Sequence, residues 1–185
     1  QANVNALGTT VIAAWAAFGK IDSFYWMIIN AFGIAITTFV GQNYGAGKYD
    51  RVRKGMIQTL GMSALSTVFI CTGFWFLGEY IIKLFTTDAE VVNQGMVILK
   101  FFVPSFITYI IIEILSGTSR GTGRSLVPMI MTIGGVCITR ILWLAIALPI
   151  KPGIITISAS YPVSWILTSI FFIIYYNGWI VKRLK

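Results

Sequence analysis

Long apolar runs without any charged residue dominate the chain. They cover residues 1–19, 23–47, 55–78, 125–139 and 152–181. About 20 apolar residues in a helix are enough to cross the ~30 Å hydrocarbon core of a bilayer. The runs lack the strict alternation of a membrane β-barrel strand, and lipid offers no hydrogen-bond partner to an open sheet edge. The pattern therefore predicts an all-α integral membrane protein.

The limits of these runs predict about five transmembrane helices. We expect them over residues 9–40, 53–77, 93–116, 126–148 and 154–180. The first is longer than a bilayer requires, so it is expected to tilt or to bend. Pro104 and Pro162 lie inside the third and fifth helices, where a proline removes a backbone donor and favours a bend. Gly33 lies between small residues in the first helix and predicts a close helix–helix approach.

Composition supports the membrane prediction. Of 185 residues, 57% are hydrophobic and 11% are charged, and the mean hydropathy is +0.82, whereas a soluble domain carries roughly 25% charged residues. The chain has no histidine, which is the commonest metal ligand and neutral-pH base. We therefore expect no metal, no organic cofactor, no catalytic residue and no enzyme activity. Because the chain begins with Gln1 and no cleavable leader follows, we expect the natural protein to be longer.

Strongly basic connections alternate along the chain with connections that carry few cations. The first and third connections and the C-terminal tail carry nine cations and one anion, whereas the second and fourth connections carry two cations and three anions. Cytoplasmic connections are enriched in Lys and Arg, so we expect a multi-pass protein of the cell membrane with its C-terminus in the cytoplasm. The net charge of +8 is explained by basic residues beside anionic lipid headgroups, not by nucleic acid.

The junction after the first predicted helix carries the most informative motif. Residues 39–51 read FVGQNYGAGKYDR. The glycines allow a sharp chain reversal, the amides can cap freed carbonyls, and the basic residues anchor the turn. Tyr49 stands where a phosphate-binding loop requires Ser or Thr, so the motif is not such a loop. The junction residues that we single out are Gly41, Gln42, Asn43, Gly45, Ala46, Gly47 and Arg51.

This junction resembles the signature of multidrug and toxic compound extrusion (MATE) transporters. Further resemblances to that family follow in its order and cover nearly the whole chain. They lie at Asn5–Gly8, at Gly117–Gly123 (which includes Arg120 and Gly121) with Pro128 and Met129, at Arg140–Leu142, and at Tyr175–Trp179 with the basic tail. The resemblance implies that the chain is most of the C-terminal lobe, about helices eight to twelve, with the seventh helix and the first lobe outside it.

The resemblance also implies an activity. It implies a two-lobe antiporter with parallel repeats, which expels organic, often cationic or amphiphilic, compounds by using the inward flow of H⁺ or Na⁺. The partners would be such a compound, membrane lipid and the N-terminal lobe of the same protein. A lone lobe is expected to be inactive in transport. The alternatives are a lipid-linked oligosaccharide flippase of the wider superfamily and a membrane subunit that transports nothing.

Five charged residues fall within the predicted helices: Lys20, Asp22, Lys100, Glu113 and Arg140. A charge near the centre of a membrane helix costs at least ~2.5 kcal/mol, so each is expected to face a partner, a cavity or the interface. Asp22 and Glu113 are the candidate ion-coupling carboxylates, with a structural ion pair as the alternative for each. Arg140 is expected to be a structural counter-ion to a carboxylate.

The remaining predictions concern the partners of Glu113 and the residues that line a cavity. Glu113 is expected to reach Arg124 or Arg140. The family's tenth-helix carboxylate would fall near Thr108 or Tyr109, and neither is acidic, so the coupling carboxylate is either Glu113, a turn later, or lies outside the chain. Lys20 and Lys100 are also expected to be structural charges or counter-ions, and they lie in the outer half of their helices. On the first helix, the candidate cavity residues are Asn30, Tyr25, Met27 and Thr37, with ordinary helix packing as the alternative.

Overall fold

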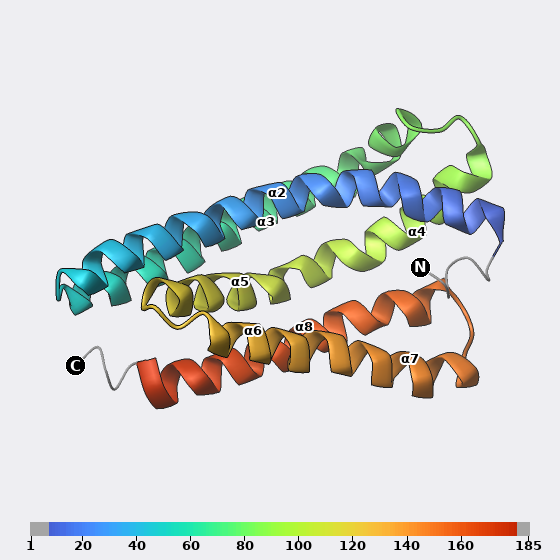
Figure 1. Ribbon diagram of the computed structural model, residues 1–185. Coiled ribbons are helices and arrows are strands. Elements are labelled where there is room, and N and C mark those ends of the chain that lie inside the picture. The colour runs from blue at the N-terminus through green and yellow to red at the C-terminus, as the bar shows by residue number, and fades with distance from the viewer. Residues whose placement is uncertain (1–7, 181–185) are drawn as a thin grey trace.

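The computed structural model describes residues 8–180, and over that range the chain is built from helices and their connections (Figure 1). Five helical stretches are long and apolar enough to cross a membrane, which confirms the predicted all-α membrane fold. The motif at Asn5 and the basic residues of the C-terminal tail lie outside the described residues. The stretches run over Thr9–Gly45, Tyr49–Lys83, Ala89–Gly121, Leu126–Ile150 and Ile154–Gly178.

The first two stretches are the single helices α2 (Thr9–Gly45) and α3 (Tyr49–Lys83). α2 is longer than predicted because Gly41 and Gly45 lie within the helix and the chain reverses only after them. Of the junction glycines, Gly47 has a positive φ of 70°. The Lys48 N–H donates to the Asn43 carbonyl at 2.8 Å, as in helix ends closed by a left-handed glycine.

The third stretch is broken near its middle. α4 (Ala89–Phe102) passes into a 3₁₀ turn at Val103–Ser105 and then into α5 (Phe106–Gly121). The break contains Pro104, as predicted, because proline cannot donate the helical hydrogen bond. Side chains bond to carbonyls around it: the Ser105 hydroxyl donates to Phe102 at 2.6 Å, and the Tyr25 hydroxyl of α2 donates to Phe106 at 2.9 Å.

The last two stretches also depart from a plain α-helix. The fourth consists of α6 (Leu126–Thr132), a π-helical segment at Ile133–Ile138 and α7 (Thr139–Ile150). The fifth consists of α8 (Ile154–Tyr175) and a π-helical end at Tyr176–Ile180. α8 runs through Pro162 as one α-helix. The π segments were not predicted, because hydropathy does not distinguish them from an α-helix.

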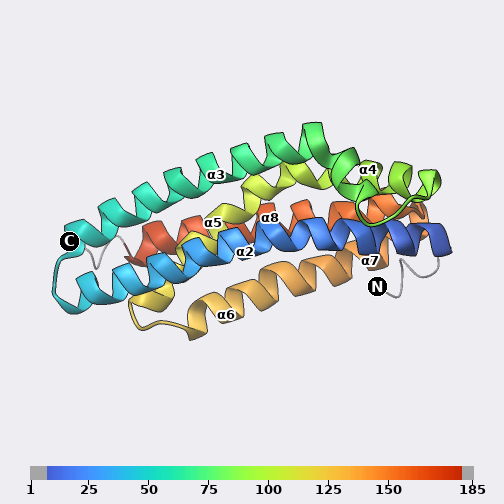
Figure 2. The same cartoon turned by 90° about the horizontal axis from the view of Figure 1, so that it is seen from above.

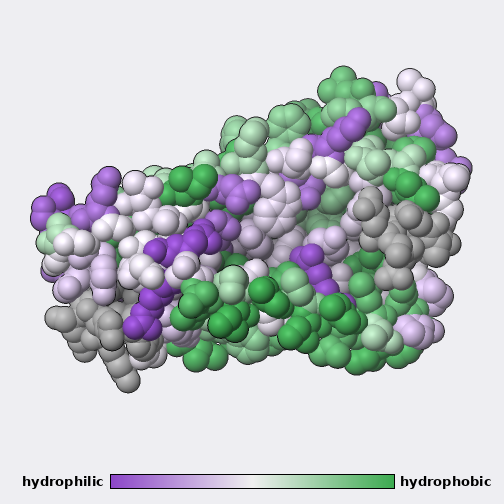
Figure 3. Space-filling model, in the orientation of Figure 1, coloured by the Kyte–Doolittle hydropathy of each residue, from purple (hydrophilic) through white to green (hydrophobic). Residues whose placement is uncertain are grey.

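The third stretch, α4 and α5, is the most buried part of the bundle and packs against α2, α3 and α8. Helix α2 lies beside it and packs against α3, α4 and α5, while α8 packs against α5 and α7; α3 and α6 lie at opposite margins (Figure 2). Large aromatic rings fill the core, among them Phe102, Phe106 and Trp165. In contrast, none of the residues of α7 is buried, and apolar side chains cover the surface there (Figure 3), as suits a face that contacts lipid.

The two basic connections lie at the same end of the bundle (Figure 1). The α5–α6 turn is closed like the α2–α3 turn: Gly123 has a positive φ of 83°, and the Arg124 N–H donates to the Ser119 carbonyl at 3.1 Å. A Cβ at Gly41 would lie 3.6 Å from the Gly121 carbonyl oxygen, so the ends of α2 and α5 are in contact. Both turns thus place their basic residues on one side of the membrane-spanning region.

Candidate functional site

A groove of about 450 Å³ opens between α2 and α5, with polar residues on both walls. The spacing of the α2 residues, three to four apart, places them on one face of that helix. Glu113 and Arg120 are seven apart, two helical turns, and share one face of α5. The structure therefore brings together four of the predicted site residues. The groove is lined by Asn30, Ile34, Thr37, Thr38, Glu113 and Arg120.

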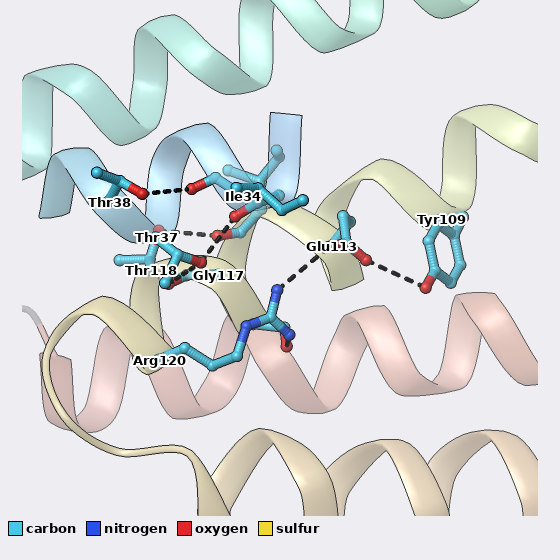
Figure 4. Close-up of polar contacts among 11 residues, drawn as sticks. Ile34, Thr37, Thr38, Tyr109, Glu113, Gly117, Thr118 and Arg120 are labelled. Carbon is cyan, nitrogen blue, oxygen red and sulfur yellow. Dashed lines mark hydrogen bonds and ion pairs between the residues drawn. The ribbon is translucent and has the colours of Figure 1, made fainter. Parts of the chain in front are cut away.

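Glu113 is a buried carboxylate with two charged or polar partners. It is 8% exposed. Its Oε1 atom lies 3.2 Å from Nη2 of Arg120, and the Tyr109 hydroxyl donates to its Oε2 atom at 3.2 Å (Figure 4). A buried charge that lost such partners would be costly, so these contacts hold the carboxylate at the wall of the groove.

Where α2 packs on α5, a glycine leaves the space that the Glu113 carboxylate occupies. A Cβ on Gly33 of α2 would overlap the Glu113 carboxyl group, so a glycine is required at that point. Farther along the crossing, a Cβ on Gly121 would lie 2.7 Å from the Thr37 carbonyl oxygen. The Thr37 hydroxyl lies 2.7 Å from the Gly33 carbonyl and 3.2 Å from that of Gly117. Small residues and one hydroxyl therefore set the distance between the two walls.

Arg120 lies in the last turn of α5 and is more accessible than its partner. Its side chain is 38% exposed, against 11% for that of Glu113. Its Nη1 atom donates to Ser116 Oγ at 2.7 Å. The predicted partners of Glu113, Arg124 and Arg140, are therefore wrong. Arg120 follows Glu113 by seven residues and lies on the same face of α5, so the ion pair forms within one helix.

Asp22 lies in a different environment, closer to the other end of α2. The Trp26 indole N–H donates to its Oδ2 atom at 2.7 Å. It lines a small cavity of about 80 Å³, which has no cationic residue in its wall. The other wall residues are mainly aromatic: Trp15, Phe18, Gly19, Trp26, Phe102, Tyr161 and Trp165.

Arg140 does not have the partner that was expected. Among residues 8–180 it forms no salt bridge with a carboxylate. Its guanidinium stacks on the Tyr161 ring, 3.8 Å from the centroid, and its Nε donates to Ser164 Oγ at 3.2 Å. The prediction of a carboxylate counter-ion is therefore wrong. The ring face supplies the compensating negative potential, and hydropathy and depth alone do not predict such a contact.

Several other predicted residues lie away from the groove. Tyr25 is 1% exposed and stacks on Phe106 with ring centroids 4.1 Å apart, so the prediction that it lines the cavity is wrong. Met27 is 65% exposed and is not a wall residue of the groove. Lys20 and Lys100 are exposed, and the Lys20 ammonium lies 4.8 Å from the Phe85 ring centroid.

Sequence reasoning missed several residues that build these sites. Tyr109 was noted only as a non-acidic position, yet its hydroxyl binds Glu113. Ser116 was not singled out, although its position midway between Glu113 and Arg120 was visible. Ser164 belongs to a row of small hydroxyl residues on α8 with Ser160 and Thr168, all buried. Their spacing of four was a signal for a polar helix face.

The fold and the site together define a multi-pass helical membrane protein with charged groups held between its helices. The chain matches the MatE family over residues 2–146. This match covers most of the chain, and the chain therefore belongs to the MatE family, which confirms the resemblance carried by its motifs.

Curated relatives agree with this assignment. The chain is 24% identical over 130 residues to "Probable multidrug resistance protein YoeA" of Bacillus subtilis, and the alignment covers 70% of the chain and 28% of that protein. It is 28% identical over 123 residues to "Probable multidrug resistance protein NorM" of Thermotoga maritima, covering 66% of the chain and 26% of NorM. The match therefore spans less than a third of each of these relatives.

A solved structure shares the fold. A MOP superfamily transporter from Pyrococcus furiosus superposes on the chain with a TM-score of 0.86 and 18% sequence identity. The superposition covers 98% of the chain and 39% of that transporter. The arrangement of the five helical stretches therefore matches part of the fold of that protein.

Proposed function

We propose that the chain is one lobe of a cation-coupled antiporter that exports organic compounds. The observation that carries the proposal is the buried Glu113 carboxylate on the wall of the α2–α5 groove. An ionisable group at membrane depth is expensive and is usually part of an ion or substrate path. In this proposal, H⁺ or Na⁺ entering the cell binds Glu113, and its binding and release are coupled to outward movement of the compound.

The groove suits this role because it is large enough for a small organic compound and has polar and apolar groups on its walls. Its volume of about 450 Å³ is of the size that small organic ligands occupy. Its walls offer the Asn30 amide and the hydroxyls of Thr37 and Thr38 beside the Glu113–Arg120 pair. These groups bind polar parts of a ligand, while Ile34 offers an apolar surface.

Asp22 is the second candidate ion-coupling carboxylate. Its neighbours include a neutral indole donor and several aromatic rings, and rings of this kind attract cations. Its cavity of about 80 Å³ suits a small cation or a cationic head group. The two carboxylates therefore offer two cation sites, of which the proposal assigns coupling to Glu113.

The whole antiporter, in this proposal, has a second lobe formed by the rest of the same protein. This is supported by the shares of the relatives that the chain matches, 28% of YoeA and 26% of NorM. The basic connections at one end of the bundle favour a cytoplasmic position for that end and for the C-terminus. Residues 1–185 alone are expected to catalyse no gradient-driven efflux, because a single lobe supplies one side of the transport path and leaves the side that would face the other lobe exposed.

The first prediction tests the coupling role directly. The full-length protein is reconstituted in vesicles, and efflux of a fluorescent organic cation is followed under an imposed pH or Na⁺ gradient. Glu113→Gln is expected to reduce efflux by at least about tenfold, as removal of a group essential to one step does. Asp22→Asn is expected to reduce it less. Glu90→Gln, at an exposed carboxylate in the first turn of α4, serves as the matched control and is expected to change nothing.

Other results of the vesicle experiment would support the alternative functions. If neither gradient drives any organic cation in the unmodified protein, the antiporter proposal is refuted. Gradient-independent movement of a lipid-linked oligosaccharide in its place would support the flippase. No movement of either compound would support a subunit that transports nothing. Unchanged efflux by Glu113→Gln would remove this residue from the coupling step while leaving antiport intact.

A further inference from the structure

Arg120 occupies the position that a cation bound to Glu113 would need. Its Nη2 atom lies 3.2 Å from Glu113 Oε1, and the pair lies on the wall of the groove (Figure 4). A carboxylate that already holds a guanidinium binds a second cation only if the first one withdraws, because the two positive charges repel each other at that distance. The ion pair therefore bears on how tightly a coupling cation binds.

A second cavity lies on the other side of Arg120. It has a volume of about 300 Å³ between the end of α5 and the start of α6, and Arg120 is part of its wall. Apart from Ser116, which anchors Arg120 in the ion pair, Ser125 and Thr132 also line it. Hydroxyl oxygens accept hydrogen bonds from a guanidinium, so this cavity can receive the Arg120 head group without a carboxylate.

The anchoring of the two partners is unequal. Glu113 is fitted against Gly33, where no side chain would fit, and it is bonded to Tyr109. The Arg120 guanidinium lies at the end of a long flexible side chain, which is 38% exposed. Its Nη1 atom donates to Ser116 Oγ at 2.7 Å. The guanidinium is therefore the partner that moves when the pair separates.

From this geometry we infer that Arg120 is a tethered competitor for the cation site at Glu113. When H⁺ or a metal cation binds Glu113, the guanidinium withdraws into the cavity beside α6; when the cation leaves, the guanidinium returns and helps to expel it. This inference rests on the proposed role of Glu113 and adds a positioning residue to it. The charge of Arg120 weakens cation binding, and its withdrawal links ion occupancy to the α5–α6 turn.

The charged groups around Glu113 are consistent with this role. On α5 it faces Tyr109 and Arg120. The α2 wall contributes the uncharged residues Gly33, Asn30, Ile34, Thr37 and Thr38. From α7, Arg140 lies against the Tyr161 and Trp165 rings, and the Trp165 ring contacts Tyr109. Arg124 lies next in the α5–α6 turn and is the natural control cation.

The test measures cation occupancy of Glu113 separately from transport. A carbodiimide reacts with protonated carboxyl groups, and mass spectrometry of the purified full-length protein reports labelling of the Glu113 peptide against pH and Na⁺ concentration. Arg120→Gln is expected to increase labelling of Glu113 about three- to tenfold at a pH where little of it is labelled in the unmodified protein, because the positive charge that competes with H⁺ has been removed. If Na⁺ protects the carboxyl group, it should do so at a three- to tenfold lower concentration.

Matched variants separate competition from a structural effect. Arg120→Lys keeps the charge and is expected to shift labelling less than Arg120→Gln, while Arg124→Gln should not shift it. Ser116→Ala removes the anchor but keeps both charges, so it should strengthen cation binding slightly. Thr132→Val removes an acceptor in the receiving cavity and should weaken cation binding. These two variants test the inference even if Arg120→Gln fails to fold.

The results that overturn the inference differ from those that overturn the proposed function. If labelling of Glu113 in Arg120→Gln equals that in Arg124→Gln, Arg120 does not compete with the cation, whatever the transport activity. If Glu113→Gln transports normally, the coupling role of Glu113 fails, and the labelling result then describes a structural ion pair only.

Discussion

Glu113 and Asp22 are both carboxylates within membrane-spanning helices, yet their surroundings differ in kind. Glu113 lies at the α2–α5 crossing, bonded to a guanidinium and a phenol beside an open groove. Asp22 lies among aromatic rings and accepts one hydrogen bond from the neutral indole of Trp26, one turn away on its own helix. The first site is ionic, with its bonded partners on one helix, whereas the second is aromatic and is lined by residues of α2, α4 and α8.

This difference shows that depth in the membrane does not determine the role of a charge. At Glu113 the opposite charge is built into the same helix, so a bound cation has to displace it. At Asp22 the described surroundings provide no cation, and rings that attract positive charge are left around an acceptor. The two sites should therefore respond differently when one of their contacts is removed.

The largest effect is expected from Gly33→Ala. The added Cβ would overlap the Glu113 carboxyl group, so the carboxylate has to move or α2 has to separate from α5. Overpacking of this kind costs about 1–3 kcal/mol, and displacement of a reacting group by about 1 Å can lower activity by tenfold or more. We expect efflux in reconstituted vesicles to fall by about tenfold or more and thermal stability in detergent to decrease.

The control for this variant is Gly61→Ala on α3. A Cβ at Gly61 meets no atom within 4 Å, so that substitution should leave efflux unchanged and should not lower stability. Carbodiimide labelling of Asp22 in Gly33→Ala should match that in the unmodified protein, since the change is confined to the ionic site. Normal efflux by Gly33→Ala would show that the position of Glu113 is not critical.

Much of the fold was predictable because the bilayer constrains it. Charge-free runs indicate where a helix can cross, and the observed stretches Leu126–Ile150 and Ile154–Gly178 begin where those runs predict. The break at Pro104 was also visible, since proline lacks a donor. The ends of α2 and α3 were less predictable, because helices extend past the hydrocarbon region while hydropathy reports only the apolar part.

The site was predicted less well, because its contacts depend on helix rotation and packing. Asn30, Thr37, Glu113 and Arg120 were all named, but Arg120 was not predicted to be the partner of Glu113. Tyr25 was expected in a cavity, and the rotation of α2 turns it instead into the core against Phe106. The residue type indicates what a side chain can bind. Which neighbours it faces depends on how each helix is rotated about its axis, and the sequence alone does not specify that rotation.

A second prediction compares the hydrogen-bond donors of the two carboxylates. Trp26→Phe removes the indole donor from Asp22, and we expect a loss of about 1–3 kcal/mol in stability, the usual cost of leaving a buried polar group unpaired. Tyr109→Phe removes one donor from Glu113 but leaves Arg120 in place, so the loss should be smaller, about 0.5–1.5 kcal/mol. Thermal or denaturant unfolding in detergent measures both. Equal losses would indicate that the indole bond to Asp22 is no more important than the phenol bond to Glu113.

The smallest effect, and the sharpest contrast, is expected from two double-mutant cycles. For Glu113→Gln with Arg120→Gln, the single changes should couple by about 0.5–1 kcal/mol, because the two groups form a partly accessible ion pair. For Asp22→Asn with Arg140→Gln, coupling should stay within about 0.3–0.5 kcal/mol of zero, the range for groups without a shared contact. Arg140 stacks on Tyr161, a ring that also lines the Asp22 cavity, so this cycle tests whether the ring transmits charge between them. A coupling as large as that of the first pair would mean that Asp22 and Arg140 act as an ion pair through the aromatic wall, and the distinction between an ionic and an aromatic site would then be lost.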